Sequence, residues 1–397
     1  MDNIKALTQK YYPEIIKLRR YFHKHPEVSK KEFNTQKKII DILSTMDLDI
    51  RIAGKTGIIA DLKGKNPGNT IAIRADIDAL AIDEERDRPY KSENKGACHA
   101  CGHDGHTAIL IGVIKILSEL RSQINGTIRF IFQPSEEEVA DGSGAHAIIE
   151  DGGLKDVDAI IGLHLWQSLP IGTAGISSGP VMAASDEFTI VIKGKAGHAS
   201  MPHQTIDSIL TASQIVVALN TIVGRDIDPM KQAVVSVGMF QSGEVYNSIA
   251  GKALLKGTIR SLDENVREDI YSHIKKIVED IYDMAGAKCS IKREPCTYVL
   301  ENDPKVTSIV LKAGREVLND NAHEIQPFMS SEDFSYYLQK IPGCFIFIGI
   351  NNPEKDIIYP QHHPKFDIDE DSLAYGMEIL SRSALKLLSE YKPKKVD

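Results

Sequence analysis

Short apolar segments that read as strands alternate with segments of helical periodicity along most of this chain of 397 residues. Helices are predicted at residues 3–22 and 31–46, and another after residue 107. The first strands are predicted at residues 57–62, 70–75, 126–132 and 159–165. Strands separated by helices are typical of an α/β domain with helices packed on a sheet. This alternation limits the chain to a small group of layered folds.

The order of elements changes between residues 181 and 294. The patterns there predict strands at 187–193, 233–240, 253–260 and 288–291, and helices at 205–223 and 263–284. The resulting β-α-β-β-α-β order matches a ferredoxin-like unit. Strand and helix alternation then resumes, with helices at 304–318 and 332–338 and a strand at 344–350. We therefore expect a discontinuous α/β catalytic domain, residues 1–180 and 295–397, and an inserted ferredoxin-like α+β lid and dimerisation domain, residues 181–294.

Composition narrows the class of protein. A hydrophobic content of 42% and a charged content of 26% are ordinary for a globular protein, and a net charge of −8 argues against nucleic acid as a partner. Five cysteines in a chain of this length do not resemble a disulfide framework. The first helix lacks the apolar core of a signal peptide, and no apolar run reaches membrane-spanning length. We expect a soluble cytoplasmic protein without a membrane partner.

The segment 99–107, HACGHDGHT, is the densest group of reactive side chains in the sequence. Thiolate and imidazole are ligands of zinc and related metals. Cys101 and His103 lie two residues apart, so on an extended segment their side chains point the same way. Two other interpretations are a redox pair formed with Cys98 and a loop of hydrogen-bonded polar residues. No thioredoxin-like pattern surrounds the cysteines, and the single CxxC lacks the second pair of a zinc knuckle.

Further polar side chains follow predicted strands. Asp76 follows TIAIRA, Glu136 and Glu137 follow GTIRFIF, and His164 lies within AIIGLHL. Ligands of an open α/β sheet bind beyond the carboxyl ends of its strands, so one crevice can collect these residues. Adjacent carboxylates at a buried strand end repel one another unless a cation is present. The donors exceed the needs of one tetrahedral ion, which favours two divalent ions.

Together these segments resemble the aminoacylase/carboxypeptidase-type metallopeptidases. The similarity is to their amidohydrolase branch, with hippurate hydrolases, indole-acetyl-amino-acid hydrolases and N-acetyl-diaminopimelate deacetylases. The matching motifs, in family order, are RRYFHKHPE (19–27), IRADIDAL (73–80), HACGHDGHTA (99–108), FQPSEEE (132–138), GLH (162–164), GKAGHASMPH (194–203), residues 247–260, SSEDFS (330–335) and HHPKFDIDE (362–370).

The resemblance implies roles for the matching residues. It implies two metal ions per subunit, of zinc, manganese, cobalt or nickel, held by Cys101, His103, Glu137, His164 and His362. Glu136 would be the general base, and Asp76 would orient a ligand or tune the base. His198, Asn247 and Arg260 in the inserted domain would contact the substrate. A homodimer through that domain is also implied.

Four positions depart from the family pattern, and one of them is Gln361, where we expect an apolar residue. Arg74 stands where many relatives outside this branch have a histidine ligand, so the Cys101–His103 pair must do that work. His363 follows His362, and we prefer His362 as the ligand because of the Pro-Lys-Phe that comes after the pair. Cys98 is unusual beside the motif, and the sequence gives it no role.

The implied reaction is hydrolysis of the amide bond of N-acyl L-amino acids by a metal-activated water. The products are a carboxylic acid and a free amino acid. Alternatives are a carboxypeptidase or dipeptidase acting on short peptides, and an N-acetyl-diaminopimelate deacetylase. A protein of another class, which binds a ligand through metal without turnover, would lack a working Glu136.

Overall fold

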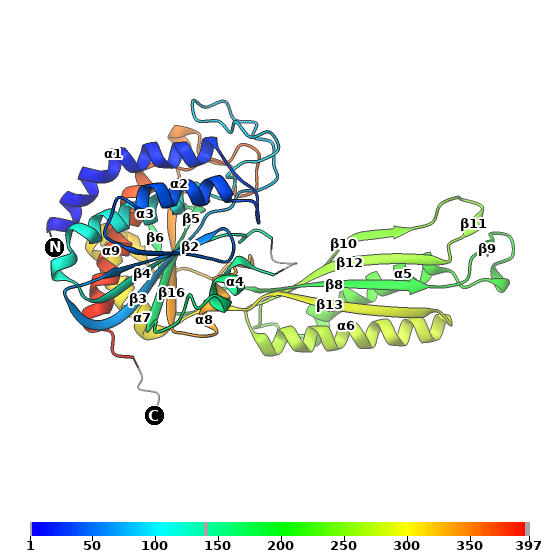
Figure 1. The fold of residues 1–397 in the computed structure, drawn as a ribbon. Coiled ribbons are helices and arrows are strands. Elements are labelled where there is room, and N and C mark those ends of the chain that lie inside the picture. Colours follow the sequence, from blue (N-terminus) through cyan, green and yellow to red (C-terminus); the bar gives the residue numbers. More distant parts are fainter. Residues whose placement is uncertain (1, 139–141, 394–397) are drawn as a thin grey trace. The chain divides into compact units, whose positions relative to one another are not determined.

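The computed structural model describes residues 2–138 and 142–393, and the chain divides into two compact units. Unit 1 comprises Met1–Gly179, Glu301–Gln326 and Asp333–Asp397, and unit 2 comprises Pro180–Leu300 and Pro327–Glu332. Two short strands, β7 (Gly179–Met182) and β14 (Leu300–Asn302), lie where the chain passes from one unit to the other. Unit 2 therefore interrupts the sequence of unit 1 (Figure 1).

Unit 1 is built on an eight-stranded sheet with the order β1-β2-β4-β3-β5-β16-β6-β15. Its strands are β1 (Asp49–Ala53), β2 (Gly57–Lys63), β3 (Asn66–Asp76), β4 (Asn125–Gln133), β5 (Ala159–Pro170), β6 (Ala174–Gly175), β15 (Ala322–His323) and β16 (Gly343–Asn351). The central strands β4, β3, β5 and β16 are parallel, whereas β1 and β2 pair antiparallel at one edge. The carboxyl ends of β4, β3 and β5 therefore meet at one edge of the sheet.

The helices of unit 1 hold the loops at that edge in place. They are α1 (Asp2–Lys24), α2 (Phe33–Leu43), α3 (His103–Glu119), α4 (Gly144–Glu150), α7 (Pro304–Leu318), α8 (Ser335–Leu338) and α9 (Asp371–Glu390). Helix α3 packs against α1, α9 and β3. A Cβ built at Gly112 would lie 2.1 Å from Met377 Sδ, so glycine permits the close approach of α3 to α9. This packing fixes the position of the first turn of α3.

Unit 2 has the ferredoxin-like order of elements, with a four-stranded sheet arranged β10-β12-β8-β13. Its elements are β8 (Ala184–Lys193), β9 (Gly197–His198), α5 (Ser208–Leu219), β10 (Ala233–Ser242), β11 (Ser248–Ile249), β12 (Lys252–Ser261), α6 (Glu264–Ala285) and β13 (Lys288–Thr297). Asp207 and Asp263 cap the amino ends of α5 and α6, and Gly286 ends α6 in the left-handed region at φ +69°. The α/β domain and the inserted α+β domain expected from the sequence are both confirmed.

Two predicted helices are shorter than expected, and one of them belongs to an apolar stretch of unit 2. The helix predicted at 332–338 covers only Ser335–Leu338, and the preceding Asp333 is buried and accepts hydrogen bonds from Gln133 and Ser143. The helix predicted at 205–223 begins at Ser208, and α5 ends at Leu219 before a π-helical turn, Ile222–Asp226. By length and composition alone, residues 208–226 are apolar enough to cross a membrane. One such helix is weak evidence for a membrane span, and the buried residues of α5, such as Ile215, belong to the core of unit 2.

Candidate metal centre

The predicted ligands of unit 1 gather beyond the ends of three neighbouring parallel strands. Asp76 is the last residue of β3 and pairs with Gln133, the last residue of β4. His164 lies in β5, on the other side of β3. The loop after β4 carries Glu136 and Glu137, and α3 begins at His103, two residues after Cys101. The sheet thus brings together side chains that are far apart in the sequence.

These side chains form two overlapping groups of metal donors. Cys101 Sγ lies 3.4 Å from His164 Nε2, and His362 Nε2 lies 3.4 Å from Glu137 Oε2. The second carboxylate oxygen, Glu137 Oε1, lies 3.8 Å from His103 Nε2. The donor atoms of Cys101, His103 and His164 lie within 4.8 Å of one another, as do those of Cys101, Glu137 and His362. Glu137 turns one oxygen towards each group, and a carboxylate in that position can serve two ions.

Unsatisfied polar atoms indicate that a cation fits between these groups. His103 Nε2 and Glu137 Oε1 are buried, and neither has a hydrogen-bond partner among the described residues. Leaving buried polar atoms unpaired costs free energy, about 1–3 kcal/mol each. Sulfur, nitrogen and oxygen donors together favour zinc and neighbouring transition metals. The residues present therefore fit the metal that the sequence motifs imply.

The two buried histidines are held so that Nε2 faces the group. His103 Nδ1 lies 3.1 Å from the backbone oxygen of Asp78 and 3.2 Å from Asp78 Oδ1. His164 Nδ1 donates to the backbone oxygen of Leu165 at 2.9 Å. Metal-binding histidines commonly donate their other ring nitrogen in this way, which fixes the tautomer. Both rings therefore present the nitrogen that a metal requires.

The charges of the predicted ligands also favour a bound cation. Burial and the carboxylates of Glu137 and Glu136 raise the pKa of the Cys101 thiol well above its ordinary value. Burial opposes a charge on His103, but Asp76 and Asp78 raise the pKa of that imidazole to about 10. In the absence of metal, protons thus occupy atoms that would be ligands. A divalent ion replaces those protons and compensates the carboxylates.

Asp78, which follows the same predicted strand as Asp76, is a supporting residue to which the sequence analysis assigned no role. Its Oδ2 accepts hydrogen bonds from the Ser29 hydroxyl at 2.7 Å and from the backbone nitrogen of Glu137 at 3.0 Å, while Oδ1 faces His103. Asp76, the predicted orienting residue, lies farther from His103 Nδ1, at 3.7 Å. The only signal for Asp78 in the sequence was its place two residues after Asp76, on the same strand end.

Asp76 also belongs to a neighbouring buried network. Asp76 Oδ1 accepts from His106 Nδ1 at 2.6 Å, and His106 Nε2 accepts from the backbone nitrogen of Leu165 at 2.9 Å. Arg74 donates to Asp76 at 2.7 Å and to Asp333 at 2.8 Å. Burial would raise the pKa of Asp76, but His103, His106 and Arg74 hold it well below the ordinary value. Arg74, which stands where many relatives have a histidine ligand, thus fixes the Asp76 carboxylate next to the predicted metal ligands.

The backbone distinguishes the two adjacent histidines. His362 adopts a left-handed conformation, with φ +65°, and its backbone nitrogen donates to Ala100 at 2.8 Å. This places the His362 ring at Glu137. His363 turns away, stacking on Tyr359 at 4.7 Å between ring centroids and accepting from the backbone nitrogen of Lys365. The geometry therefore agrees with the preference for His362.

The predicted substrate contacts lie in unit 2. His198 is exposed, and its Nδ1 accepts from the Ser200 hydroxyl at 2.7 Å. The backbone oxygen of Asn247 accepts from Ala199 at 3.1 Å, so Asn247 lies beside His198. Arg260 is half-buried and donates to the Ser331 hydroxyl at 2.6 Å. The structure groups His198 with Asn247 within unit 2 and places Arg260 on a separate strand, β12.

Comparison with known proteins identifies the family. Residues 72–386 match the model of peptidase family M20/M25/M40. The chain belongs to this family. A thermostable carboxypeptidase 1 of Saccharolobus solfataricus is 41% identical over 95% of this chain and 96% of its own. An N-acetyl-L-cysteine deacetylase of Bacillus subtilis is 40% identical over 96% and 90%.

A solved structure from the family agrees with the fold. It is a Bacillus subtilis protein described as a dinuclear metal-binding peptidase of the M20 family. Its sequence is 36% identical, its TM-score is 0.82, and the match covers 96% of this chain and 99% of the other. The family resemblance and the enzyme class inferred from the motifs, a peptidase-type hydrolase, are confirmed.

Proposed function

We propose that the protein is a metal-dependent amidohydrolase that cleaves the amide bond of N-acyl L-amino acids. The observation that carries this proposal is the pair of overlapping donor groups that share Cys101, with buried unpaired atoms on His103 and Glu137. A hydrolase of this family needs an electrophile that polarises the acyl carbonyl and activates water. The similarity to an N-acetyl-L-cysteine deacetylase supports an N-acyl amino acid as the substrate.

In this proposal, two divalent ions are held by Cys101, His103, Glu137, His164 and His362. Zinc, manganese, cobalt and nickel are candidates, and the similarity to a dinuclear metal-binding peptidase supports two ions rather than one. When bound, such ions polarise a carbonyl oxygen and lower the pKa of water towards about 7. Asp78 orients His103, and Asp76 stabilises the protein around the ligands through His106 and Arg74.

Glu136 is proposed as the general base. It directly precedes Glu137, so one glutamate of the pair can bind metal while the other remains able to take a proton. Glu136 would accept a proton from the attacking water and deliver it to the nitrogen of the leaving amino acid. The oxygen donors of Glu136 and Glu137 and a ring nitrogen of His103 lie within 4.8 Å of one another, which supports this role for Glu136.

Arg260 is proposed to bind the carboxylate of the substrate. Burial lowers the pKa of its guanidinium, and Arg260 forms no ion pair with a carboxylate among the described residues. A guanidinium binds a carboxylate through two parallel hydrogen bonds, and a half-buried one without a partner is suited to that use. His198 and Asn247, which adjoin each other in unit 2, are proposed to hold the scissile amide.

We also propose a homodimer formed through unit 2. Strand β10 is an edge of its sheet, and Met239 and Phe240 on that strand are exposed. Helix α5 exposes Leu210 at 58% and Val217 at 71%. Unpaired edges and exposed apolar side chains favour association, and a second copy offers the same surface. The cytoplasm is the proposed compartment.

A panel of substrates tests the function. N-acetyl and N-benzoyl amino acids and dipeptides would be incubated with the enzyme and each of the four metals, and the released amino acid measured. We expect metal-dependent hydrolysis of N-acyl amino acids that a chelator abolishes. Faster cleavage of dipeptides would favour a carboxypeptidase, to which the similarity with the Saccharolobus protein points. Metal binding without hydrolysis of any compound would contradict the proposal and favour a binding protein.

A further inference from the structure

A second group of metal donors lies outside the proposed catalytic centre. It consists of His23 at the end of α1 and of Glu84 and Cys98 in the segment 77–102. One nitrogen of His23, one oxygen of Glu84 and the sulfur of Cys98 lie within 4.8 Å of one another. Cys98 is completely buried, and the side chains of His23 and Glu84 are 1% and 2% exposed. This is the cysteine to which the sequence gave no role.

His23 and Glu84 are each held in place by a hydrogen bond at the side-chain atom that points away from the other two donors. His23 Nδ1 hydrogen-bonds with Asp104 Oδ2 at 2.7 Å, which leaves Nε2 towards Glu84. Glu84 Oε2 accepts from the backbone nitrogen of Ser92 at 2.7 Å, which leaves Oε1 towards His23. A carboxylate that holds the far nitrogen of a histidine is the usual arrangement around metal-binding imidazoles.

The spacing of these atoms is that of a long hydrogen bond, and it also equals the separation of two ligands on one metal ion. His23 Nε2 lies 3.4 Å from Glu84 Oε1. A hydrogen bond between charged groups would be about 2.7–2.9 Å long. Two ligands bound to zinc at about 2.0–2.1 Å with tetrahedral angles lie about 3.3–3.4 Å apart. The His362–Glu137 pair in the proposed catalytic centre has the same separation, 3.4 Å.

The surroundings of the group are short of positive charge. Arg19 is shared between Asp104 and Asp367, and no lysine or arginine among the described residues forms an ion pair with Glu84. Asp104 Oδ1 and both ring nitrogens of the nearby His99 are buried and have no hydrogen-bond partner among the described residues. A charge on Glu84 therefore needs either a proton on the His23 imidazole or a metal ion.

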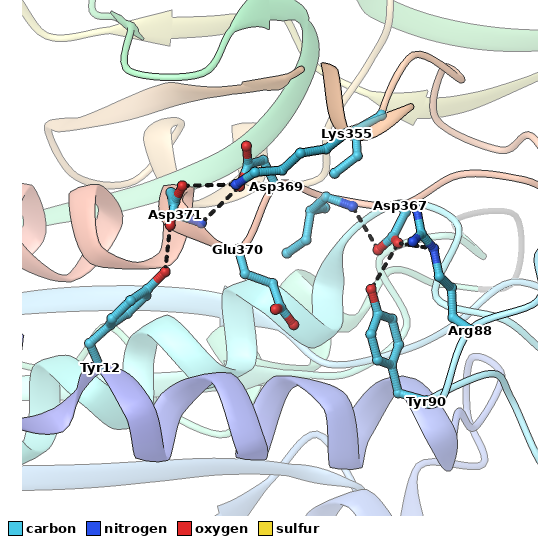
Figure 2. A pocket seen from close by; sticks show the side chains of 10 residues that line it. Tyr12, Arg88, Tyr90, Lys355, Asp367, Asp369, Glu370 and Asp371 are labelled. Carbon is cyan, nitrogen blue, oxygen red and sulfur yellow. Dashed lines mark hydrogen bonds and ion pairs between the residues drawn. The ribbon is translucent and has the colours of Figure 1, made fainter. Parts of the chain in front are cut away.

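A pocket approaches the group from the surface. It has a volume of about 360 Å³ and is lined by residues that include Tyr90, Arg88 and Asp367 (Figure 2). Within it Asp369 and Asp371 pair with Lys355, and Tyr90 donates to Asp367 at 2.9 Å. The Tyr90 ring also packs edge-on against His23, with centroids 5.5 Å apart. Tyr90 is thus the lining residue that contacts the histidine, and the three proposed ligands do not themselves line the pocket.

We propose that His23, Glu84 and Cys98 bind a further divalent cation of the thiophilic class, such as zinc, with a structural role. The segment 77–102 contains no helix or extended strand, and it ends just after the catalytic ligand Cys101. Long irregular segments need anchoring, and an ion would join both arms of this one to α1. On binding, Cys98 releases its thiol proton and His23 releases its Nε2 proton, both to solvent, as the sulfur and the nitrogen bond to the metal. The proposal does not depend on the reaction that the enzyme catalyses.

The competing explanation is a proton. Burial and Arg19 lower the pKa of His23, but Asp104 and Glu84 outweigh them and raise it to about 9. An imidazolium between two carboxylates would satisfy the same charges without metal. That explanation predicts that Cys98 contributes nothing to metal binding.

Metal analysis separates the two explanations. Wild type, Cys98→Ala and Cys344→Ala would be purified from zinc-supplemented cultures, dialysed against zinc-free buffer, and their zinc measured per chain by plasma mass spectrometry. Cys344 is equally buried and lies in β16, so its replacement controls for loss of a core thiol. We expect one equivalent less zinc in Cys98→Ala than in wild type and Cys344→Ala. Equal zinc in all three would overturn the proposal.

A second pair of variants covers the case in which Cys98→Ala does not fold. Glu84→Gln removes the carboxylate ligand, and Glu85→Gln changes an exposed neighbour in the same way. Glu84→Gln should lose the same equivalent of zinc, and Glu85→Gln should keep it. A cobalt-loaded Cys101→Ser variant should also retain near-ultraviolet thiolate-to-cobalt absorption, which the additional Cys98→Ala change removes. Unchanged zinc in Glu84→Gln, or no such absorption in Cys101→Ser, would also contradict the proposal.

Discussion

Asp78 shows how one residue can organise the proposed metal centre without binding metal. Its two carboxylate oxygens reach His103, Ser29 and the backbone of Glu137, so a single side chain positions two ligands. Burial would raise its pKa, but His103 and Ser29 keep the pKa of Asp78 below the ordinary value. The carboxylate is therefore charged at neutral pH and, by accepting from Nδ1, fixes the ring so that Nε2 faces the other ligands.

Replacing Asp78 by asparagine should weaken metal binding. Loss of the partner of a metal-binding histidine typically reduces affinity by roughly 10–100-fold. Metal affinity measured by competition with a chromophoric chelator should fall by that factor in Asp78→Asn, and remain unchanged in Asp41→Asn, a change on the surface of α2. Wild-type affinity in Asp78→Asn would mean that the contact with His103 is incidental.

Arg260→Lys tests the recognition of the substrate carboxylate. A charged hydrogen bond contributes about 1.5–3 kcal/mol, which corresponds to roughly 10–150-fold in rate. Because lysine cannot make the two-pronged contact, kcat/KM for an N-acyl amino acid should fall by that range, whereas kcat/KM for its amide should change little. If both substrates slow equally, Arg260 has a structural role, such as holding Ser331.

At the level of elements, the contact between α3 and α9 sets the position of the first metal ligands. His103 begins α3, and Gly112 lies two turns further along, against Met377 of α9 and Ile15 of α1. A side chain at Gly112 would push the helices apart. The sequence predicted α3 from its apolar run, but it could not show that Gly112 is a point of close approach, because that depends on α9, far along the chain.

Gly112→Ala should therefore destabilise the protein even though alanine favours helices. The helix propensity gain is about 1 kcal/mol, and overpacking a core costs typically 1–3 kcal/mol. We expect a net loss of about 1 kcal/mol by urea denaturation. Combining it with Met377→Ala should give less destabilisation than the sum of the single changes. Strict additivity would show that the two residues do not meet.

At the level of the whole molecule, the sequence predicted the order of elements, the interruption by unit 2 and the strand ends where polar residues gather. Those features depend on local periodicity and on short motifs. The supporting contacts were not predictable in the same way. Arg74 contacts Asp333 only in the folded chain, and the same holds for His23 and Asp104. No local sequence pattern predicts a contact between positions so far apart. His362 was separable from His363 by sequence only as a preference, because a left-handed backbone decides where its ring points.

The proposed dimer makes a prediction for the intact chain. Light scattering at micromolar concentration should give twice the mass of the 43.9 kDa chain. Val217→Glu places a charge on the exposed face of α5 and should shift the mass towards the monomer, whereas Lys276→Glu, on α6, should not. A fully active wild-type protein with the mass of a monomer would contradict the proposed dimer.

The division of roles between Glu136 and Glu137 is the central claim, and one comparison tests it most directly. Metal content and turnover of an N-acetyl amino acid would be measured in Glu136→Gln and Glu137→Gln prepared in parallel. Glu136→Gln should keep the wild-type metal content and lose at least about 10²-fold in kcat, the scale of general-base catalysis. Glu137→Gln should lose metal. Loss of metal in Glu136→Gln, or near wild-type turnover in that variant, would contradict the account.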